Sequence, residues 1–425
     1  MMRAVALIDG EHYAPVVRDA LAEVPYEVVG ALLVGGTEKL RGGDEYGVPV
    51  VHELEEALAR FEPEAVVDLS DEPVLGPRER FRLASRVLAA GIAYEGPDFS
   101  LRSPVFESFP RPSLAVIGTG KRMGKTAVTG YAARLLAQEH DLVVVSMGRG
   151  GPAEPQVADV RPTVDDLLAL SREGSHAASD YLETAALSGV PTIGCRRAGG
   201  GLAGATWTSN VAAGMRKALE REPELVLFDG SGAAVPPVDV DARILVAGAH
   251  QDPELVAGYL NAYRILISNL VVLTMAEEGT PWEAAAGAIH GVRDIPVVAT
   301  VLRPRPVSSI AGKRVAFFTT AVPSAADRLA AHLRDEHGAT EVAVSSNLSD
   351  RTALRADIAS ADADVFLVEI KAAAIDVVCE AAQAAEIELV FADNEVVPRE
   401  GQPDLDELLR GLAADAVSSA AEAVA

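Results

Sequence analysis

The stretch GTGKRMGKT, from Gly118 to Thr126, has the composition and spacing of a loop that binds phosphate groups. In such a loop, backbone N–H groups and the N-terminus of the next helix contact phosphate oxygens, while the closing lysine reaches the terminal phosphates. The hydroxyl group that follows this lysine ligates magnesium. Lys125 and Thr126 stand at these two positions. We therefore predict an ATP site formed by Gly118, Thr119, Gly120, Lys121, Arg122, Met123, Gly124, Lys125 and Thr126.

The loop departs from the usual pattern G-x-x-x-x-G-K-[ST], because Thr119 replaces the first glycine and Gly118 lies one position earlier. The form Gly-Thr-x-x-x-x-Gly-Lys-Thr is similar to the loop of dethiobiotin synthetase and its relatives. That family phosphorylates a small carboxylate-like group and then closes a ring. Lys121 and Arg122 add two positive charges inside the loop. We expect them to act with Lys125 as catalytic groups that hold the γ-phosphoryl group of ATP.

A buried acidic group is predicted by the run LVLFDGSG, residues 225–232, in which four apolar residues precede Asp229. Phosphate loops need an acidic magnesium partner at the end of a nearby strand. We therefore predict that Asp229 takes part in catalysis and that Asp229 and Thr126 bind Mg²⁺. The alternative is an ordinary turn that an aspartate closes. The string Asn-Lys-x-Asp, usual in guanine-specific proteins, does not occur in the chain, which favours ATP over GTP.

Two further segments combine arginine with glycine at predicted strand ends, SMGRGGPAEPQ at 146–156 and GCRRAGGGLAG at 194–204. Open α/β sheets bind ligands at such strand ends, and arginine binds phosphate oxygens through two parallel hydrogen bonds. One such segment is usually a plain loop, but two of them favour a polyanion site. The predicted substrate-binding residues here are Arg149, Gly150, Glu154, Arg196 and Arg197. Cys195 adjoins this site without an evident base, so we expect it to pack in the core.

Two residues outside this central region are also candidates for binding substrate. His12 follows the first predicted strand in LIDGEHYAP, close to Asp9 and Glu11, and Lys371 follows the run VFLVEI. Strand ends again suggest a site for both residues. However, a lone histidine is usually structural and a lone lysine is usually solvated.

Composition narrows the classes of partner. The formal net charge of the 425 residues is −25, so general binding to nucleic acid or to an anionic membrane is not expected. A polyanionic substrate would then need a local cluster of arginines. The two cysteines have no metal-type spacing, and we expect free thiols in a reducing cytoplasm. The best membrane candidate, residues 263–275, is far shorter than the ~20 residues of a spanning helix.

The chain alternates short β-branched runs with alanine- and leucine-rich stretches, which is typical of α/β domains with parallel sheets. We predict a Rossmann-like domain at 1–100, a central phosphate-loop domain at 113–305 and a third α/β domain at 306–425. A proline-rich passage at 96–113 is the predicted linker, and the third unit is expected to open after RPRPVSSIAGK. The strands predicted after the phosphate loop lie at 141–148, 190–195, 225–232, 242–249, 269–275, 314–320, 341–346, 365–370 and 388–393.

With these segments in place, the chain resembles the cyclic 2,3-diphosphoglycerate synthetase family. The resemblance rests on LIDGEHY, VVDLSDEP, VIGTGKRMGKTAV, GRGGPAEP, FDGSGAAVPPV and VEIKAAAIDVV, which run from residue 7 to residue 378. It implies a ligase that uses ATP and magnesium to convert 2,3-diphosphoglycerate into its internal phosphoanhydride, with release of ADP and phosphate. The cysteine usage described above predicts a cytoplasmic enzyme, and we expect this enzyme to form a homodimer. The open alternatives are a ligase or kinase for another small acid, and a nucleotide-dependent switch or maturation factor.

Overall fold

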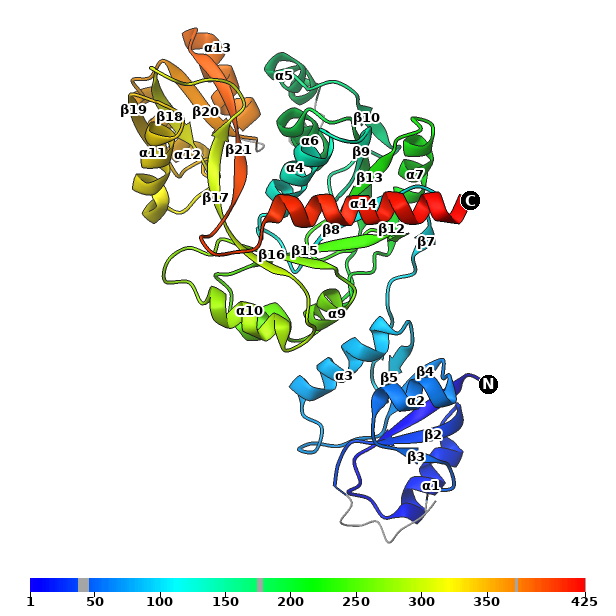
Figure 1. The fold of residues 1–425 in the computed structure, drawn as a ribbon. Coiled ribbons are helices and arrows are strands. Elements are labelled where there is room, and N and C mark those ends of the chain that lie inside the picture. The colour runs from blue at the N-terminus through cyan, green and yellow to red at the C-terminus, as the bar shows by residue number, and fades with distance from the viewer. Residues whose placement is uncertain (37–45, 174–178, 371–373, 425) are drawn as a thin grey trace.

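The computed structural model describes residues 1–36, 46–173, 179–370 and 374–424, and it confirms the predicted α/β class with mostly parallel sheets (Figure 1). Figure 1 shows an N-terminal unit in blue, a central unit in cyan and green, and a C-terminal unit in yellow and orange. Among the described helices, none combines the length and the apolar character that crossing a bilayer requires.

The N-terminal unit is a six-stranded sheet in the order β3-β2-β1-β4-β5-β6, parallel except for β6. The first strand is almost wholly buried, as expected for parallel strands that helices cover on both faces. Its elements are β1 (Arg3–Ile8), α1 (Ala14–Glu23), β2 (Glu27–Leu33), β3 (Val50–Val51), α2 (Leu54–Phe61), β4 (Ala65–Asp68), α3 (Pro77–Ala89), β5 (Ala93–Glu95) and β6 (Ser100–Leu101).

The central unit is built around β8, which lies between β13 and β15 in a parallel sheet. Strand β8 and its neighbour β13 are buried along their whole length, because helices cover both faces of the sheet. Its elements are β7 (Glu107–Ser108), β8 (Ser113–Gly118), α4 (Lys125–Leu136), β9 (Leu142–Gly148), β10 (Gln156–Ala158), α5 (Val164–Arg172), α6 (Asp180–Ser188), β11 (Thr192–Ala198), β12 (Thr208–Ser209), α7 (Val211–Leu219), β13 (Leu225–Asp229), β14 (Val238–Asp239), β15 (Ala242–Gly248), α8 (Pro253–Ala257), α9 (Asn261–Leu266), β16 (Leu270–Thr274) and α10 (Trp282–His290).

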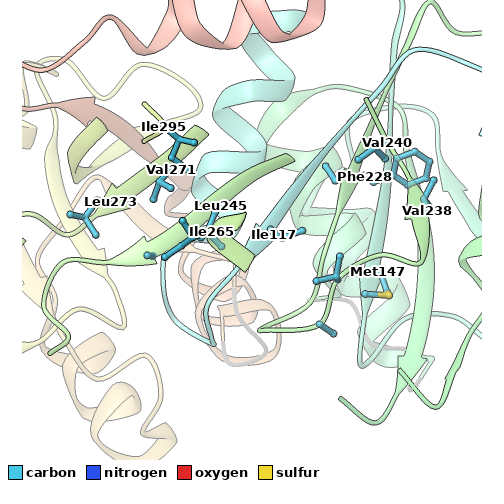
Figure 2. Packing of buried hydrophobic residues seen from close by; sticks show 14 of the residues in the cluster. Ile117, Met147, Phe228, Val238, Val240, Leu245, Ile265, Val271, Leu273 and Ile295 are labelled. Carbon is cyan, nitrogen blue, oxygen red and sulfur yellow. The ribbon is translucent and has the colours of Figure 1, made fainter. Parts of the chain in front are cut away.

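One face of this sheet carries a continuous apolar core. Figure 2 shows Phe228, Ile117 and Leu245 projecting from the neighbouring strands β13, β8 and β15 into the same layer. Val271 and Leu273 of β16 belong to the same buried cluster. The strands that end at the candidate site are therefore held in place by the core of the whole domain. Burial of each large apolar side chain contributes about 1.5 to 3 kcal/mol to the stability of that core.

The sheet does not stop at the central unit, because β17 (Val297–Pro306) pairs with β16 on one side and with β21 on the other. The sequence RPRP, expected to precede the third unit, forms the end of this strand. Prolines argue against a strand in sequence, so the residue pattern does not predict β17. The remaining elements are β18 (Arg314–Phe318), a 3₁₀ turn (Pro323–Ala325), α11 (Ala326–Asp335), β19 (Glu341–Ser345), α12 (Arg351–Ser360), β20 (Val365–Glu369), a π-helix (Ala374–Cys379), α13 (Glu380–Ala385), β21 (Glu388–Pro398) and α14 (Leu405–Val424).

The last helix returns to the central unit. Helix α14, red in Figure 1, runs across the central sheet and contacts α4 and β8. Its residues Leu405 and Leu409 are buried in the same cluster as Ala127 and Val128 of α4. The C-terminal end of the chain thus covers the helix that begins at the phosphate loop.

A buried ionic network also joins the C-terminal unit to α4. Arg134 near the end of α4 is paired with Asp393 and lies 3.2 Å, from Nη2 to Oε2, from Glu395. Arg305 of β17 reaches the same two carboxylates, each at 3.1 Å. Because Asp393 is only 2% exposed, this network holds β17, β21 and α4 in one arrangement.

The N-terminal unit contacts the central unit through α3. Ser85 donates a hydrogen bond from Oγ to the carbonyl oxygen of Tyr259 at 3.1 Å, and the ring of Phe81 lies 5.6 Å from the ring of Tyr259. Arg78 and Glu254 form an exposed ion pair beside these contacts. Leu260 and Tyr263 of the central unit are also buried in one apolar cluster with Leu83 and Val87 of α3, so the contact has a hydrophobic core.

Candidate active site

The phosphate loop has the strand–turn–helix form that its sequence predicts. Strand β8 ends at Gly118 and α4 begins at Lys125, so the loop occupies the carboxyl edge of the central sheet. Gly124 has a φ of +75°, a left-handed conformation that favours glycine. The hydroxyl group of Thr274 donates a hydrogen bond of 2.7 Å to the carbonyl oxygen of Met123, which anchors the loop to the end of β16.

Asp229 lies where the sequence places it, at the last position of β13, and its side chain meets the phosphate loop. The carboxylate is 0% exposed and pairs with Nζ of Lys125. Thr129 donates a hydrogen bond to it at 2.9 Å, and Oγ of Ser146 lies 3.4 Å away. Burial raises the pKa of Asp229, while Lys125 opposes that shift. The side chains of Lys125, at the start of α4, and Asp229, at the end of β13, thus meet at the carboxyl edge of the sheet.

A second group of cations lies beside the first, at the turn Gly230–Gly232 that follows β13. Nη2 of Arg197 donates a hydrogen bond of 2.8 Å to the carbonyl oxygen of Ser231. A Cβ atom on Gly232 would lie 3.6 Å from Cγ of Lys121 and 3.7 Å from Nη2 of Arg197. Cationic side chains from the phosphate loop and from β11 therefore meet at one turn, as the sequence predicts for a polyanion site.

The GRGG segment lies against the end of β11 through backbone contact. A Cβ atom on Gly151 would lie 2.0 Å from the carbonyl oxygen of Cys195, so only glycine allows this approach. Arg149, Gly150 and Glu154 in the same segment are exposed, as is Arg196. The exposed arginines are consequently accessible to a ligand at the carboxyl edge of the sheet.

The sequence reasoning missed one acidic residue of this site, Asp180, the first residue of α6. Its Oδ2 lies 3.0 Å from the position that a Cβ atom on Gly148 would take. Burial raises the pKa of Asp229 and the charge of Asp180 adds to that shift, whereas burial lowers the pKa of Arg197 and Asp180 opposes it, so Asp180 acts on both groups. In sequence, Asp180 follows Ser179 at the start of a helix and not at a strand end. The available signal was therefore only an acidic first turn, which most helices share.

His12 lies in a different cleft, of about 810 Å³, lined entirely by residues of the N-terminal unit. Its Nδ1 is 3.5 Å from Oδ1 of Asp9, and its Nε2 is 3.8 Å from Oδ2 of Asp71. These three side chains offer ligand atoms within 4.8 Å of one another and could hold a divalent cation. Lys371, the other outlying candidate, lies outside the described residues.

Both cysteines are buried, and burial raises the pKa of Cys195 and Cys379 to about 12. The expected result is that neither thiol reacts with a disulfide reagent at about pH 8 in the folded protein, because the thiolate is the reactive form. Both should react after unfolding in denaturant. Absorbance of the released thiol measures this directly, and rapid reaction of the folded protein would contradict the core placement of Cys195.

Comparisons with known proteins cover nearly the full chain. Models of the cyclic 2,3-diphosphoglycerate synthetase N-terminal, P-loop and C-terminal domains match residues 3–102, 113–302 and 306–395. A cyclic 2,3-diphosphoglycerate synthetase from Rubrobacter xylanophilus is 53% identical, covering 93% of this chain and 94% of the relative. A protein of the same name from Methanothermobacter thermautotrophicus is 38% identical, covering 95% of this chain and 94% of the relative. Another from Thermococcus kodakarensis is 41% identical, covering 94% of this chain and 95% of the relative.

Among solved structures, LpxK from Aquifex aeolicus in complex with ATP aligns at a TM-score of 0.43 and 14% identity. That alignment covers 72% of this chain and 90% of the other. The hydrogenase maturation factor HypB from Archaeoglobus fulgidus aligns at a TM-score of 0.30 and 12% identity, covering 45% and 82%. The sequence relatives, not these distant folds, confirm the resemblance that the motifs carry.

Proposed function

Because the chain belongs to the cyclic 2,3-diphosphoglycerate synthetase family, we propose that it is a ligase that uses ATP and magnesium to close 2,3-diphosphoglycerate into its internal phosphoanhydride. ADP and inorganic phosphate are the other products. The names of the relatives support an enzyme with a ligase-type reaction and do not favour a switch or a kinase for another acid. The substrate is a small polyanion, and a homodimer stays a prediction.

The observation that carries this proposal is the meeting of cations from two segments, the phosphate loop and β11, at the turn after β13. Lys125 pairs with Asp229 at the start of this turn, and Lys121 and Arg197 flank Gly232 at its end. A nucleotide alone occupies the phosphate loop, so the additional arginine suits a second group of phosphates beside the γ-phosphate. Placing charged groups where negative charge accumulates is the main means of catalysing phosphoryl transfer.

In the first step, an oxygen of one substrate phosphate attacks the γ-phosphorus of ATP. The bond from that phosphorus to the β–γ bridging oxygen breaks, and ADP leaves. The role of Lys125, Lys121 and Arg122 is to neutralise the charge that gathers on the transferred group. Arg149, Arg196 and Arg197 hold the substrate phosphates, which would otherwise repel the γ-phosphate.

In the second step, the other substrate phosphate attacks the phosphorus of the phosphate that was activated. A new P–O–P bridge closes the ring, and the bond to the transferred phosphoryl group breaks to release inorganic phosphate. Both reacting groups belong to one molecule, so orientation can supply an effective concentration on the order of 10⁵ M or more. The predicted role of the arginines is to hold the two phosphates in that orientation.

The residues present suit magnesium. Carboxylate and hydroxyl oxygens, such as those of Asp229 and Thr126, are the hard ligands that this ion prefers. The buried carboxylate of Asp229 already pairs with the cation Lys125, and the negative charge of Asp180 acts on the same group, so positive charge at this place is electrostatically favoured. We assign Thr126 and Asp229 as its protein ligands. When bound, magnesium supplies positive charge to the oxygens of the β- and γ-phosphates.

Phosphorus NMR tests the proposal. The protein is incubated with ATP, magnesium and 2,3-diphosphoglycerate, and we expect new signals from a cyclic pyrophosphate together with ADP and inorganic phosphate. Samples without ATP or without the acid should give no cyclic product. If ATP is hydrolysed at the same rate with and without the acid and no cyclic signal develops, the proposed function is wrong.

Arg197→Ala is expected to raise KM for 2,3-diphosphoglycerate about 10- to 100-fold, because a hydrogen bond to a charged group contributes about 1.5 to 3 kcal/mol. KM for ATP should change little, since Arg197 comes from β11 and not from the phosphate loop. Steady-state ADP release measures both constants. Arg314→Ala is the control, because Arg314 pairs with Asp362 and Asp364 in the C-terminal unit. Equal effects of the two variants would contradict the role of Arg197.

A further inference from the structure

We infer that Asn210 is a positioning residue that ties together two arginine-bearing segments, the GRGGPAEP loop and the end of β11 with the loop that follows it, as one polyanion-binding unit. This inference rests on the proposed function, because it concerns how the substrate arginines are held. Asn210 lies between β12 and α7, and no motif in the sequence singles it out. It is not itself a catalytic group, since its contacts are with protein backbone.

The side chain of Asn210 bridges both loops through its whole amide group. Its Oδ1 accepts a hydrogen bond of 2.7 Å from the backbone N–H of Arg196. Its Nδ2 donates to the carbonyl oxygens of Pro152 at 3.1 Å and Ala153 at 2.9 Å. The backbone N–H of Asn210 also donates to the carbonyl oxygen of Arg196 at 3.2 Å. One residue thus fixes the GRGGPAEP segment against the end of β11.

Asn210 makes these bonds instead of capping its own helix. It is the N-cap residue of α7, a position where asparagine normally accepts a hydrogen bond from the first turn. Its side chain makes no such bond, and the N–H of Val211 is bound instead by Oγ of Ser209 at 3.1 Å. The side chain of Asn210 therefore connects the two arginine-bearing segments and does not cap α7.

The chemistry of the bridge requires asparagine. One acceptor and two donors are used at once, and aspartate lacks the donors while serine lacks the second donor. Serine is nevertheless about as good an N-cap residue as asparagine. A change from asparagine to serine therefore removes the bridge and leaves the start of α7 with a side chain that can cap it.

The arginines on the two loops need such a restraint. Burial and the positive charge of Arg149 both lower the pKa of Arg197, which means that the two guanidinium groups repel each other across the site. Repulsion favours separation of the loops before a polyanion binds. The amide of Asn210 is neutral, so it resists this separation without changing the net charge of the site. Such preorganisation increases affinity for the ligand.

The test compares Asn210→Ser with Asn269→Ser. Asn269 is the matched control, because its Oδ1 also accepts a backbone hydrogen bond, from Arg243 at 3.0 Å, but at the amino edge of the sheet. For Asn210→Ser we expect KM for 2,3-diphosphoglycerate to rise about tenfold, the factor that one lost hydrogen bond of ordinary strength can give. KM for ATP and the thermal midpoint should stay at the wild-type values.

Hydrogen exchange of the intact protein adds a readout that does not depend on turnover. The backbone amide of Arg196, which donates to Oδ1 of Asn210, should exchange faster in Asn210→Ser than in wild type or in Asn269→Ser. Unchanged exchange, or faster exchange with an unchanged KM for the acid, overturns the inference. A fall in thermal midpoint with KM for ATP and for the acid rising together also overturns it, since that pattern indicates general damage.

The two proposals can fail separately. If wild-type protein shows no turnover that depends on 2,3-diphosphoglycerate, the proposed function fails. The role of Asn210 is then tested by calorimetry, which measures the binding of inorganic pyrophosphate to wild type, Asn210→Ser and Asn269→Ser in the presence of an ATP analogue. Binding that is about tenfold weaker in Asn210→Ser than in Asn269→Ser supports a tethered polyanion site. Equal binding by the two variants overturns it.

Discussion

Lys125→Ala is expected to lower kcat about 10²- to 10³-fold, the loss that follows removal of one preorganised group that stabilises transition-state charge. Lys125 is 10% exposed and pairs with Asp229 at the edge of the sheet where the γ-phosphate is expected. Alanine removes the cation and leaves a buried carboxylate without its partner. Single-turnover measurements of ADP formation, made well below the thermal midpoint of the variant, separate the chemical effect from the loss of stability.

Lys313→Ala provides the control for this variant. Lys313 is also ion-paired, with Nζ 2.6 Å from Oε2 of Glu388, but it lies in the C-terminal unit at the start of β18. We expect kcat of the control to equal that of wild type. If Lys125→Ala kept more than about a tenth of the wild-type rate, the assignment of this lysine to the transferred phosphoryl group would be wrong.

Asp393→Ala is expected to lower the free energy of unfolding by about 3 to 5 kcal/mol, the usual cost of removing one partner from a buried ion pair. Asp393 is 2% exposed, and it pairs with Arg134 of α4 and Arg305 of β17. Its removal leaves the two guanidinium groups to share the carboxylate of Glu395. Denaturant titration followed by circular dichroism measures the change, provided that unfolding is a single transition.

The matched control is Asp362→Ala, which breaks an ion pair with Arg314 in which the Asp362 side chain is 86% exposed. No measurable change in the unfolding midpoint is expected, because exposed pairs contribute little. A similar loss in both variants would show that burial does not set the contribution of Asp393. Two separate transitions in Asp393→Ala would instead indicate that β21 and α4 unfold independently once the network is broken.

The parts of the site that the sequence predicted are those encoded by short, continuous motifs. Gly124 and Lys125 mark the junction of strand and helix, and four apolar residues before Asp229 mark a buried strand with an acid at its end. Parallel strands present their carboxyl ends at one edge, so the order of residues along the chain is enough to place several strand ends together. The two arginine-bearing segments follow from the same reasoning.

The residues that sequence reasoning missed lack such a local signal. Asp180 and Asn210 each begin a helix, where acidic residues and asparagine are common for reasons unrelated to function. Their contacts are with segments that lie elsewhere in the chain, namely Asp180 with Gly148 and Asn210 with Pro152. Nothing in the spacing of a single sequence distinguishes these two residues from ordinary helix starts.

The sequence by itself determined the α/β class, the phosphate loop and the acidic strand end, because each depends on the order of neighbouring residues. Only the tertiary structure decided that β17 continues the central sheet into the C-terminal unit and that α14 returns to cover α4. Packing also decided which charged groups meet, as when Lys121 and Arg197 flank Gly232. Which side chains come into contact depends on how segments distant in sequence pack their apolar faces together. That packing is driven by the removal of apolar surface from water, which involves the whole chain at once.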